Sequence, residues 1–252
     1  MYALNASAFE LAMIARRESR RFEAEIHVVA KRYNITLVVG MYSEGSGELS
    51  RNTFIVAGSD GESLGRYEKL HLYDAFHYRE SDKNERAPLL KDFGELCLFN
   101  LGGLRFGLLN CYDLRFPEIA RALVDRGAEV LLIGSGWVTG PLKEMHWDTL
   151  LRARAIENTC YVAAACQPAP LSVGLSMVVD PGGLSIATVP DMEGLAIAHL
   201  TAERLAAVRR MLPCLQHRRY DVIQKVDGSA QSLSPSEMTH ANSDLALMKE
   251  VQ

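Results

Sequence analysis

The sequence has no long apolar segment and no excess of basic residues. No stretch approaches the roughly 18 uninterrupted apolar residues that a membrane-spanning helix needs. Lys and Arg number 27 against 31 Asp and Glu, for a net charge of -4, so nothing draws the chain to nucleic acid or anionic lipid. The first residues also lack a basic region followed by an apolar core, as an export signal requires. We therefore expect a cytoplasmic protein that acts on a small molecule, with no nucleic-acid or membrane partner.

Cysteine is scarce, and no pair has the close spacing of a zinc or redox site. The five cysteines are far apart in the sequence: Cys97, Cys111, Cys160, Cys166 and Cys214. Most lie in apolar runs, where a buried thiol acts as a small hydrophobe. The sequence also contains no phosphate-cradling glycine loop and no Gly-x-Ser-x-Gly elbow. We expect neither a metal nor a cofactor.

Apolar residues at helical and strand spacings alternate along most of the chain. The helical pattern covers residues 9–34, 117–126, 147–157 and 201–211, with Thr201 as an N-cap. Short apolar, β-branched runs predict strands at 35–41, 53–57, 104–111, 129–133, 161–166, 177–179 and 195–199. Turns at 59–61 and 181–183 join neighbouring strands, and 45–47 is typical of a hairpin loop. This interleaving predicts an α/β or α+β fold in layers, with helices outside a mixed sheet.

One large domain and a polar tail account for the whole sequence. Composition changes after Arg219, and from Lys225 onward the chain is mostly polar. We therefore divide the sequence into a domain at 1–224 and a C-terminal tail at 225–252.

Cys111 stands where a predicted strand meets a predicted helix. The apolar run at 104–111 leads directly into it, and Pro117 starts the helix. Such a turn exposes a side chain, leaves backbone N–H groups free for an oxyanion, and places a thiol where the helix dipole favours the thiolate. A buried cysteine that simply ends a strand is the alternative interpretation.

A second concentration of polar residues lies at 67–82. Ionisable side chains follow one another there, and Lys69 comes directly after a strand-like stretch. A catalytic thiol needs a base or a cation beside it, which this segment can supply. The alternative for any one of these residues is a solvated loop.

Three sequence blocks resemble those of the nitrilase superfamily of carbon-nitrogen hydrolases. They are YEKLHLYDAF (67–76), CYDLRFPE (111–118), and GPLKEMHW (140–147) with LLRARAIEN (150–158) after it. The third block, with 161–165, 174–181 and 213–219, is similar to the branch that holds deaminated glutathione amidases and ω-amidases. The resemblance covers roughly residues 22–219.

The resemblance implies a four-layer α-β-β-α sandwich that forms a homodimer and hydrolyses a small linear amide, with water as co-substrate. The expected substrate is deaminated glutathione or an ω-amide of a dicarboxylic acid, cleaved through a cysteine acyl-enzyme with release of ammonia. Cys111 is then the nucleophile, Lys69 stabilises the oxyanion, and Glu80 orients the substrate or the lysine. The backbone N–H of Tyr112 completes the oxyanion hole, and no metal or organic cofactor is implied.

The family's general-base glutamate has no counterpart before Lys69. It stands in a Pro-Glu step at the end of an early strand, and the spacing places that step at or before Met1, together with a first strand-helix-strand unit. We therefore expect the sandwich to lack that unit. Glu10 precedes the first arginines, but its helical context indicates a solvated helix face. A catalytically impaired or inactive protein that dimerises or binds a ligand is accordingly the second hypothesis.

Other polar and aromatic residues are weaker candidates for the site. Trp137 follows an apolar strand and is predicted to line the pocket, as the matching family position does, although plain core is the alternative. Glu144 is predicted to contact the substrate; the alternative is that it lies in a polar surface loop without a role in the site. A papain-like Cys-His pair is a further alternative, with His71, His77 or His146 as the partner of Cys111. It would leave the Lys69 and Cys111 blocks unexplained. Asp113 and Arg115 are interpreted as scaffold.

Overall fold

The computed structural model describes residues 6–225. Residues Met1–Val222 form one unit and Ile223–Gln252 a second. The predicted division between 224 and 225 stays a prediction, because the predicted tail beyond Lys225 lies outside the described residues.

The long helix α2 (Ala8–Tyr33) forms because its sequence carries a complete start signal and helical apolar spacing. Ser7 is the N-cap: its hydroxyl accepts from the Glu10 N–H at 3.2 Å, and the Glu10 carboxylate accepts from the Ser7 N–H at 2.8 Å. The helix ends at Asn34, which adopts a left-handed conformation with φ 50°. Glu10 is therefore used in the cap, which agrees with its interpretation as an exposed helix residue.

Helix α2 packs on a three-stranded antiparallel sheet. The strands run in the order β1 (Leu37–Glu44), β2 (Ser50–Ala57) and β3 (Ser63–Glu68). The loop at 45–49 joins β1 to β2, as the predicted hairpin requires. The sequence indicates a strand-like stretch before Lys69 but gives no bounds for β3, because most of its residues are polar or small and only Tyr67 is fully buried.

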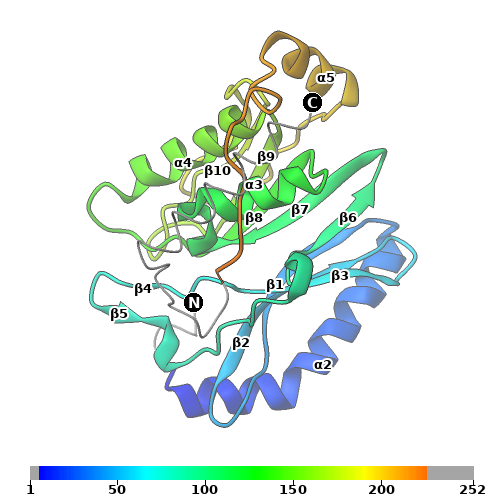
Figure 1. Cartoon of the computed structure of the whole chain (residues 1–252). Coiled ribbons are helices and arrows are strands. Elements are labelled where there is room, and N and C mark those ends of the chain that lie inside the picture. The colour runs from blue at the N-terminus through cyan, green and yellow to red at the C-terminus, as the bar shows by residue number, and fades with distance from the viewer. Residues whose placement is uncertain (1–5, 226–252) are drawn as a thin grey trace, which may run out of the picture. The chain divides into compact units, whose positions relative to one another are not determined.

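The second sheet has six strands in the order β11-β10-β9-β8-β7-β6. Strands β7, β8 and β9 are parallel, and the remaining pairs are antiparallel. Their bounds are β6 Leu98–Leu101, β7 Leu104–Asn110, β8 Val130–Ser135, β9 Tyr161–Cys166, β10 Ser176–Val179 and β11 Ser185–Val189. Helices α3 (Pro117–Asp125) and α4 (Lys143–Asn158) lie beside this sheet in Figure 1, and α5 (Ala202–Met211) begins at Thr201, the predicted N-cap.

Short elements fill the connections. A two-stranded ribbon consists of β4 (Asp74–Ala75) and β5 (Tyr78–Arg79). Three 3-10 turns follow in the chain: η1 (Glu80–Asp82), η2 (Lys91–Phe93) and η3 (Cys111–Arg115).

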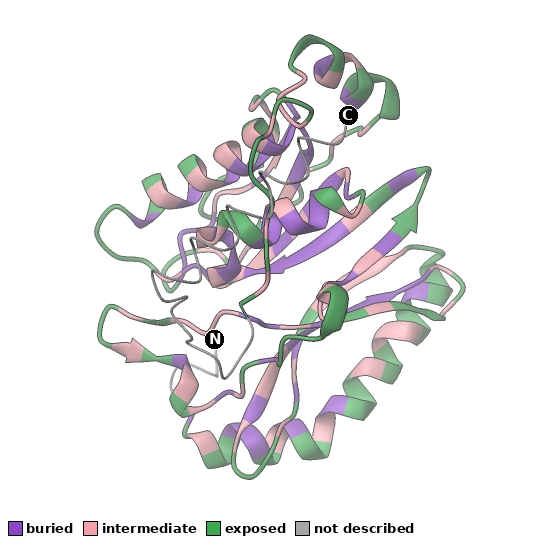
Figure 2. Cartoon of the chain, viewed as in Figure 1, coloured by how far each residue is buried: buried purple, intermediate pink, exposed green. Residues whose placement is uncertain are grey.

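The two large sheets pack face to face. One apolar cluster joins Phe54, Val56 and Tyr67 of the first sheet to Leu108 and Leu131 of the second. With α2 on one outer face and α3 and α4 on the other, the layers run helix, sheet, sheet, helix (Figure 1). Buried residues concentrate on the strands and on the inner sides of these helices (Figure 2). The predicted α-β-β-α sandwich is confirmed.

Two glycines leave room for the Phe54 ring: Gly134 on the facing sheet, which lets the two sheets approach closely, and Gly40 on the neighbouring strand of the same sheet. A Cβ atom on Gly134 of β8 would lie 2.4 Å from Phe54 Cζ, and one on Gly40 of β1 would lie 2.7 Å from its Cε1. Neither distance is sterically possible, so the Phe54 ring occupies the space that the two missing side chains leave.

The predicted strand at 195–199 is wrong. The segment alternates in exposure, with Leu195 and Ile197 exposed by 87% and 81%, but it pairs with no strand in the described part of the chain. Alternation alone does not make a strand, because the ladder also needs a neighbouring edge to supply hydrogen bonds. Between residues 6 and 225 no helix is long and apolar enough to cross a bilayer.

Candidate active site

A cavity of about 810 Å³ opens between the carboxyl ends of the central strands, α2 and β1. Its volume falls within the range of small-molecule sites. Helix α2 contributes the apolar side chains of Leu11, Ile14 and Phe22 to the lining, together with the polar Glu18 and Ser19. The other polar lining residues are Asn52, Lys69, Glu80, Asn110, Cys111, Arg115, Lys143 and Gln167, and the hydroxyl-bearing ones are Tyr42, Tyr73, Tyr78, Tyr112 and Ser135.

Cys111 enters this cavity from a strained turn. Strand β7 ends at the buried Asn110, and Cys111 then adopts a left-handed conformation with φ 49°, which a side chain with a Cβ rarely takes. The 3-10 turn η3 begins at this residue, and α3 follows from Pro117. Strain of this kind persists where the surroundings enforce it, and such residues concentrate at functional sites. The predicted strand-to-helix turn is therefore present and presents the thiol to the cavity.

Asp113 fixes this turn to the segment that carries Lys69. Its fully buried carboxylate accepts from the Tyr67 hydroxyl at 2.6 Å, the His71 N–H at 3.1 Å and the Asn110 N–H at 2.9 Å. The His71 ring reaches the same carboxylate through Nδ1 at 2.8 Å. Tyr67 and His71 lie two residues on either side of Lys69. Asp113 therefore fixes the position of Lys69 relative to Cys111, which agrees with its interpretation as scaffold.

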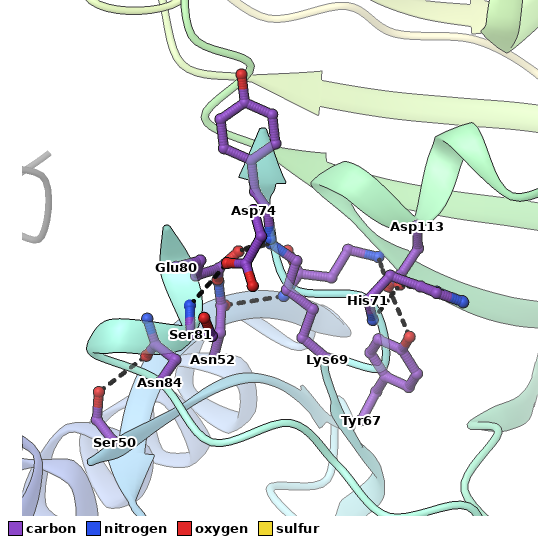
Figure 3. A network of polar contacts seen from close by, with 12 residues as sticks. Ser50, Asn52, Tyr67, Lys69, His71, Asp74, Glu80, Ser81, Asn84 and Asp113 are labelled. Carbon is purple, nitrogen blue, oxygen red and sulfur yellow. Dashed lines mark hydrogen bonds and ion pairs between the residues drawn. The ribbon is translucent and has the colours of Figure 1, made fainter. Parts of the chain in front are cut away.

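Lys69 and Glu80 form a buried ion pair. Lys69 Nζ donates to Glu80 Oε2 at 2.5 Å, and the two side chains are only 3% and 7% exposed. Glu80 also accepts from the Tyr73 N–H at 2.7 Å and from Asn52 Nδ2 at 3.1 Å. Figure 3 shows the two carboxylates on either side of Lys69, Glu80 with Asn52 and Asp113 with His71. Asn110 Nδ2 donates to Asn52 Oδ1 at 2.9 Å, which links the Glu80 group back to the end of β7.

The pKa of Lys69 is raised despite its burial. Burial alone lowers it, but the negative charges of Cys111 and Glu80 and the hydrogen bond to Glu80 outweigh that effect. Lys69 is therefore an ammonium at neutral pH. Lys69 and Cys111 both line the cavity, so the two groups belong to one site.

Three of the other four cysteines have thiols whose pKa is raised by burial. Burial raises the pKa of Cys97 to about 11, that of Cys160 to about 12 and that of Cys166 to about 11. These three thiols stay protonated at neutral pH and are poor nucleophiles. They are structural cysteines, as the apolar runs around Cys97 and Cys166 predict.

The predicted pocket residues separate into two groups. Tyr112 and Trp137 line the cavity, and the Tyr112 ring packs edge-on against Tyr73 and Phe116. Glu144 is exposed in the first turn of α4 and is not among the described residues that line the cavity, so its substrate contact stays a prediction.

The histidine alternative finds no support in the described contacts. His71 Nδ1 is bound to Asp113, and its ring stacks on Phe116 with centroids 3.8 Å apart. His146 Nδ1 contacts Arg115 at 3.3 Å, and His77 is exposed. Among residues 6–225, no histidine hydrogen-bonds to Cys111 Sγ, so no Cys-His pair of the papain kind forms.

The sequence did not single out three residues that shape the site. Asn52 holds Glu80 through its side-chain amide and lies in an ordinary strand context, and Tyr73 holds it through its backbone N–H and lies in the 67–76 block without a role assigned to it. Lys143 lines the cavity and belongs to the 140–147 block, in which Glu144 was the predicted substrate contact. The described residues also contain no group of three or more His, Cys, Asp or Glu side chains placed to hold a metal ion.

Comparison with known proteins agrees with this arrangement. The family model described as carbon-nitrogen hydrolase matches residues 2–210. The chain is 46% identical over 170 residues to putative protein YbeM of Escherichia coli K12, a match that covers 66% of this chain and 86% of that protein. It is also 46% identical to deaminated glutathione amidase of Escherichia coli O157:H7 over 66% of this chain, but spans only 62% of that relative's length.

Solved structures with this fold include the NitFhit protein of Caenorhabditis elegans. It matches with a TM-score of 0.76 and 30% identity, over 88% of this chain and 56% of that one. A mutant of the amidase from Nesterenkonia sp. AN1, whose active-site cysteine carries acrylamide, matches with a TM-score of 0.64 and 26% identity, over 84% and 78% of the two chains. Given the match of the family model and the 46% identical relatives, the chain belongs to the carbon-nitrogen hydrolase family, within the nitrilase superfamily.

Proposed function

We propose that this chain hydrolyses the carbon–nitrogen bond of a small linear amide through a cysteine acyl-enzyme at Cys111. The observation that carries the proposal is the placement of three groups in one cavity: a thiol on a strained turn, and the buried Lys69–Glu80 pair whose charges interact with it. The substrate we propose is deaminated glutathione or an ω-amide of a dicarboxylic acid. Relatives described as deaminated glutathione amidases support this choice.

In the first half of the reaction, the Cys111 sulfur attacks the amide carbonyl carbon. The carbonyl oxygen becomes an oxyanion, which the Lys69 ammonium and the Tyr112 backbone N–H stabilise. The carbon–nitrogen bond then breaks, and the nitrogen leaves with the proton that the thiol gave up. A primary ω-amide releases ammonia, whereas deaminated glutathione is a secondary amide and releases an amine, so the expected release of ammonia applies to ω-amides alone.

In the second half, water attacks the thioester carbonyl. The acid product departs, and the proton from water restores the Cys111 thiol. Glu80 contacts the Lys69 ammonium directly, so we assign to this carboxylate the orientation of Lys69, and the proton of the thiol passes to the leaving nitrogen through the Lys69–Glu80 pair. Its fixed contacts with Asn52 and Tyr73 hold it in position throughout.

Release of ammonia from a panel of ω-amides, and of amine from deaminated glutathione, tests this proposal. Cys111→Ala should lower turnover by at least about 10³-fold, since Cys111 is the only thiol among the described residues that line the cavity. Cys166→Ala, which removes a neighbouring buried thiol, is the matched control and should keep most of the activity. Unchanged turnover in Cys111→Ala would show that the thiol is not the nucleophile.

Ligand binding without turnover is a second candidate function. It is favoured by one observation: among the described residues, no carboxylate or imidazole hydrogen-bonds to Cys111 Sγ, so its base must act through Lys69 or from elsewhere. A chain that binds dicarboxylates but releases no product from any amide supports this candidate. The homodimer and the cytoplasmic location stay predictions.

A further inference from the structure

Lys143 is a buried cation at the wall of the active-site cavity. It is the first residue of α4, its exposed fraction is 5%, and it lines the cavity together with Tyr73 and Trp137. The mechanism proposed above does not use it.

The contacts of Lys143 offer no negative charge. Its Nζ donates to the Tyr73 hydroxyl at 2.9 Å. Three aromatic rings surround the ammonium, with centroids 4.2 Å away for Phe76, 4.9 Å for Tyr73 and 5.7 Å for Trp137. Within residues 6–225 no carboxylate forms an ion pair with it. One of its three N–H donors is used in these contacts, and two remain for a partner.

This position is unfavourable for an ammonium without an anion. A buried charge is costly unless it is paired, and ring faces recover only a fraction of the lost hydration. The N-terminal turn of a helix adds to the cost, because the helix dipole favours negative charge there. The residue before Lys143, Leu142, is held in a left-handed conformation with φ 60°, so the backbone is also strained at this point.

We propose that Lys143 is the specificity-determining residue that binds the carboxylate of the substrate at the end remote from the scissile amide. An incoming carboxylate supplies the missing charge, accepts the remaining N–H donors, and interacts favourably with the N-terminus of α4. The proposal rests on the proposed function and adds to it the residue that selects, among short linear amides, those with a terminal carboxylate.

Tyr73 sets the distance between this anion subsite and the catalytic pair. Its backbone N–H donates to Glu80 Oε2, and its hydroxyl accepts from Lys143 Nζ. One tyrosine side chain therefore separates Lys143 from the Lys69–Glu80 pair. That separation suits a molecule with an amide carbonyl at one end and a carboxylate a few carbon atoms away.

Steady-state kinetics with two matched substrates test the proposal. Succinamate carries the carboxylate, and succinamide has a neutral amide in its place. Lys143→Met should lower kcat/KM for succinamate by about 10- to 100-fold, the range expected for loss of one hydrogen bond to a charged group. The effect should appear chiefly in KM. For succinamide the variant should stay within about 3-fold of the unchanged chain, and Lys143→Arg should recover much of the succinamate rate.

Lys83→Met is the matched control. Lys83 lies 5.7 Å from the Tyr78 ring centroid and is not among the residues that line the cavity, so the variant also loses a positive charge beside an aromatic ring. It should change neither substrate's kinetics. Equal losses for succinamate and succinamide in Lys143→Met would overturn the proposal, because a purely structural role affects both substrates.

A binding measurement separates this proposal from the proposed function. Calorimetry with succinate needs no turnover: Lys143→Met should weaken succinate binding by about 10-fold or more, and Lys83→Met should not. If the chain hydrolyses no amide but shows this difference, the anion subsite stands and the proposed function fails. If succinate does not bind the unchanged chain, or binds Lys143→Met equally well, the subsite is refuted. Lys143→Gln serves as the test variant if the methionine variant does not fold.

Discussion

Replacing Glu80 with glutamine isolates the contribution of the buried ion pair. The substitution keeps the shape of the side chain but removes its charge. Lys69 is then left as a buried ammonium, since its Nζ makes its hydrogen bond to Glu80. Removing one partner of a buried pair typically costs about 3–5 kcal/mol of unfolding free energy. The glutamine amide also turns a donor toward the Tyr73 N–H or Asn52 Nδ2, both of which donate to the carboxylate.

The opposite substitution, Lys69→Met, should cost less. In Lys69→Met, Glu80 keeps the hydrogen bonds that Asn52 and Tyr73 donate to it. In Glu80→Gln, by contrast, Lys69 loses the carboxylate of its ion pair. Replacing both residues with apolar ones, as in Lys69→Met with Glu80→Leu, should cost less than the sum of the two single losses, because no buried charge remains. The Tyr73 N–H and Asn52 Nδ2 still lose their acceptor in that double variant.

Urea unfolding measures these differences. Glu68→Gln is the matched control, because Glu68 pairs with Arg51 at 3.3 Å with side chains 25% and 32% exposed, and its loss should cost no more than about 1 kcal/mol. The Glu80→Gln defect should also shrink as pH rises. Stability from the raised pKa of Lys69 is present below its unfolded pKa and is lost as pH rises through the folded value, so the pair contributes little at high pH. A neutral-pH loss below about 1 kcal/mol for Glu80→Gln would refute this reasoning.

The backbone and the buried thiols give three further predictions. Cys111→Gly should be about 1 kcal/mol more stable than Cys111→Ala in urea unfolding, because glycine accepts φ 49° without strain; equal stability would contradict the strain assigned to this turn. Gly134→Ala should lose about 1–3 kcal/mol through its clash with Phe54, whereas Gly136→Ala, whose Cβ has only ordinary contacts, should not; similar values for both would contradict the close packing of the sheets. Because the pKa of Cys160 is raised to about 12, the folded state loses stability as pH rises above about 9. When the pH rises from about 8 to about 10, the unfolding free energy of Cys160→Ala should therefore fall by about 1 kcal/mol less than that of the unchanged chain. Urea unfolding at both pH values measures this difference.

The sequence predicts the site better than it predicts the contacts that hold the site together. Cys111 could be found because a strand, a thiol and a helix start coincide, and Lys69 and Glu80 because two family blocks carry them. The role of Asp113 as the anchor between both blocks requires the packing of Tyr67 and His71 around it. That packing joins residues more than 40 positions apart, which no local pattern encodes.

The same limit explains the errors and omissions in the fold. The sequence provides no bounds for strand β3 because its side chains are mostly polar or small, while the predicted strand at 195–199 finds no partner edge among the described strands. In the 140–147 block, the neighbouring residues Lys143 and Glu144 are both charged, and the sequence does not show which of them faces the cavity. The first turn of α4 exposes Glu144 and buries Lys143 against three rings, and this depends on how the helix packs.

The central claim is that Cys111 forms the acyl-enzyme. Its most direct test is mass spectrometry of the chain quenched in acid during turnover of succinamate, followed by peptide mapping. We predict a succinyl thioester on Cys111 that disappears as substrate is exhausted and is absent from Cys111→Ala. Steady hydrolysis with no acyl group on Cys111, or an acyl group carried by another cysteine, would contradict it.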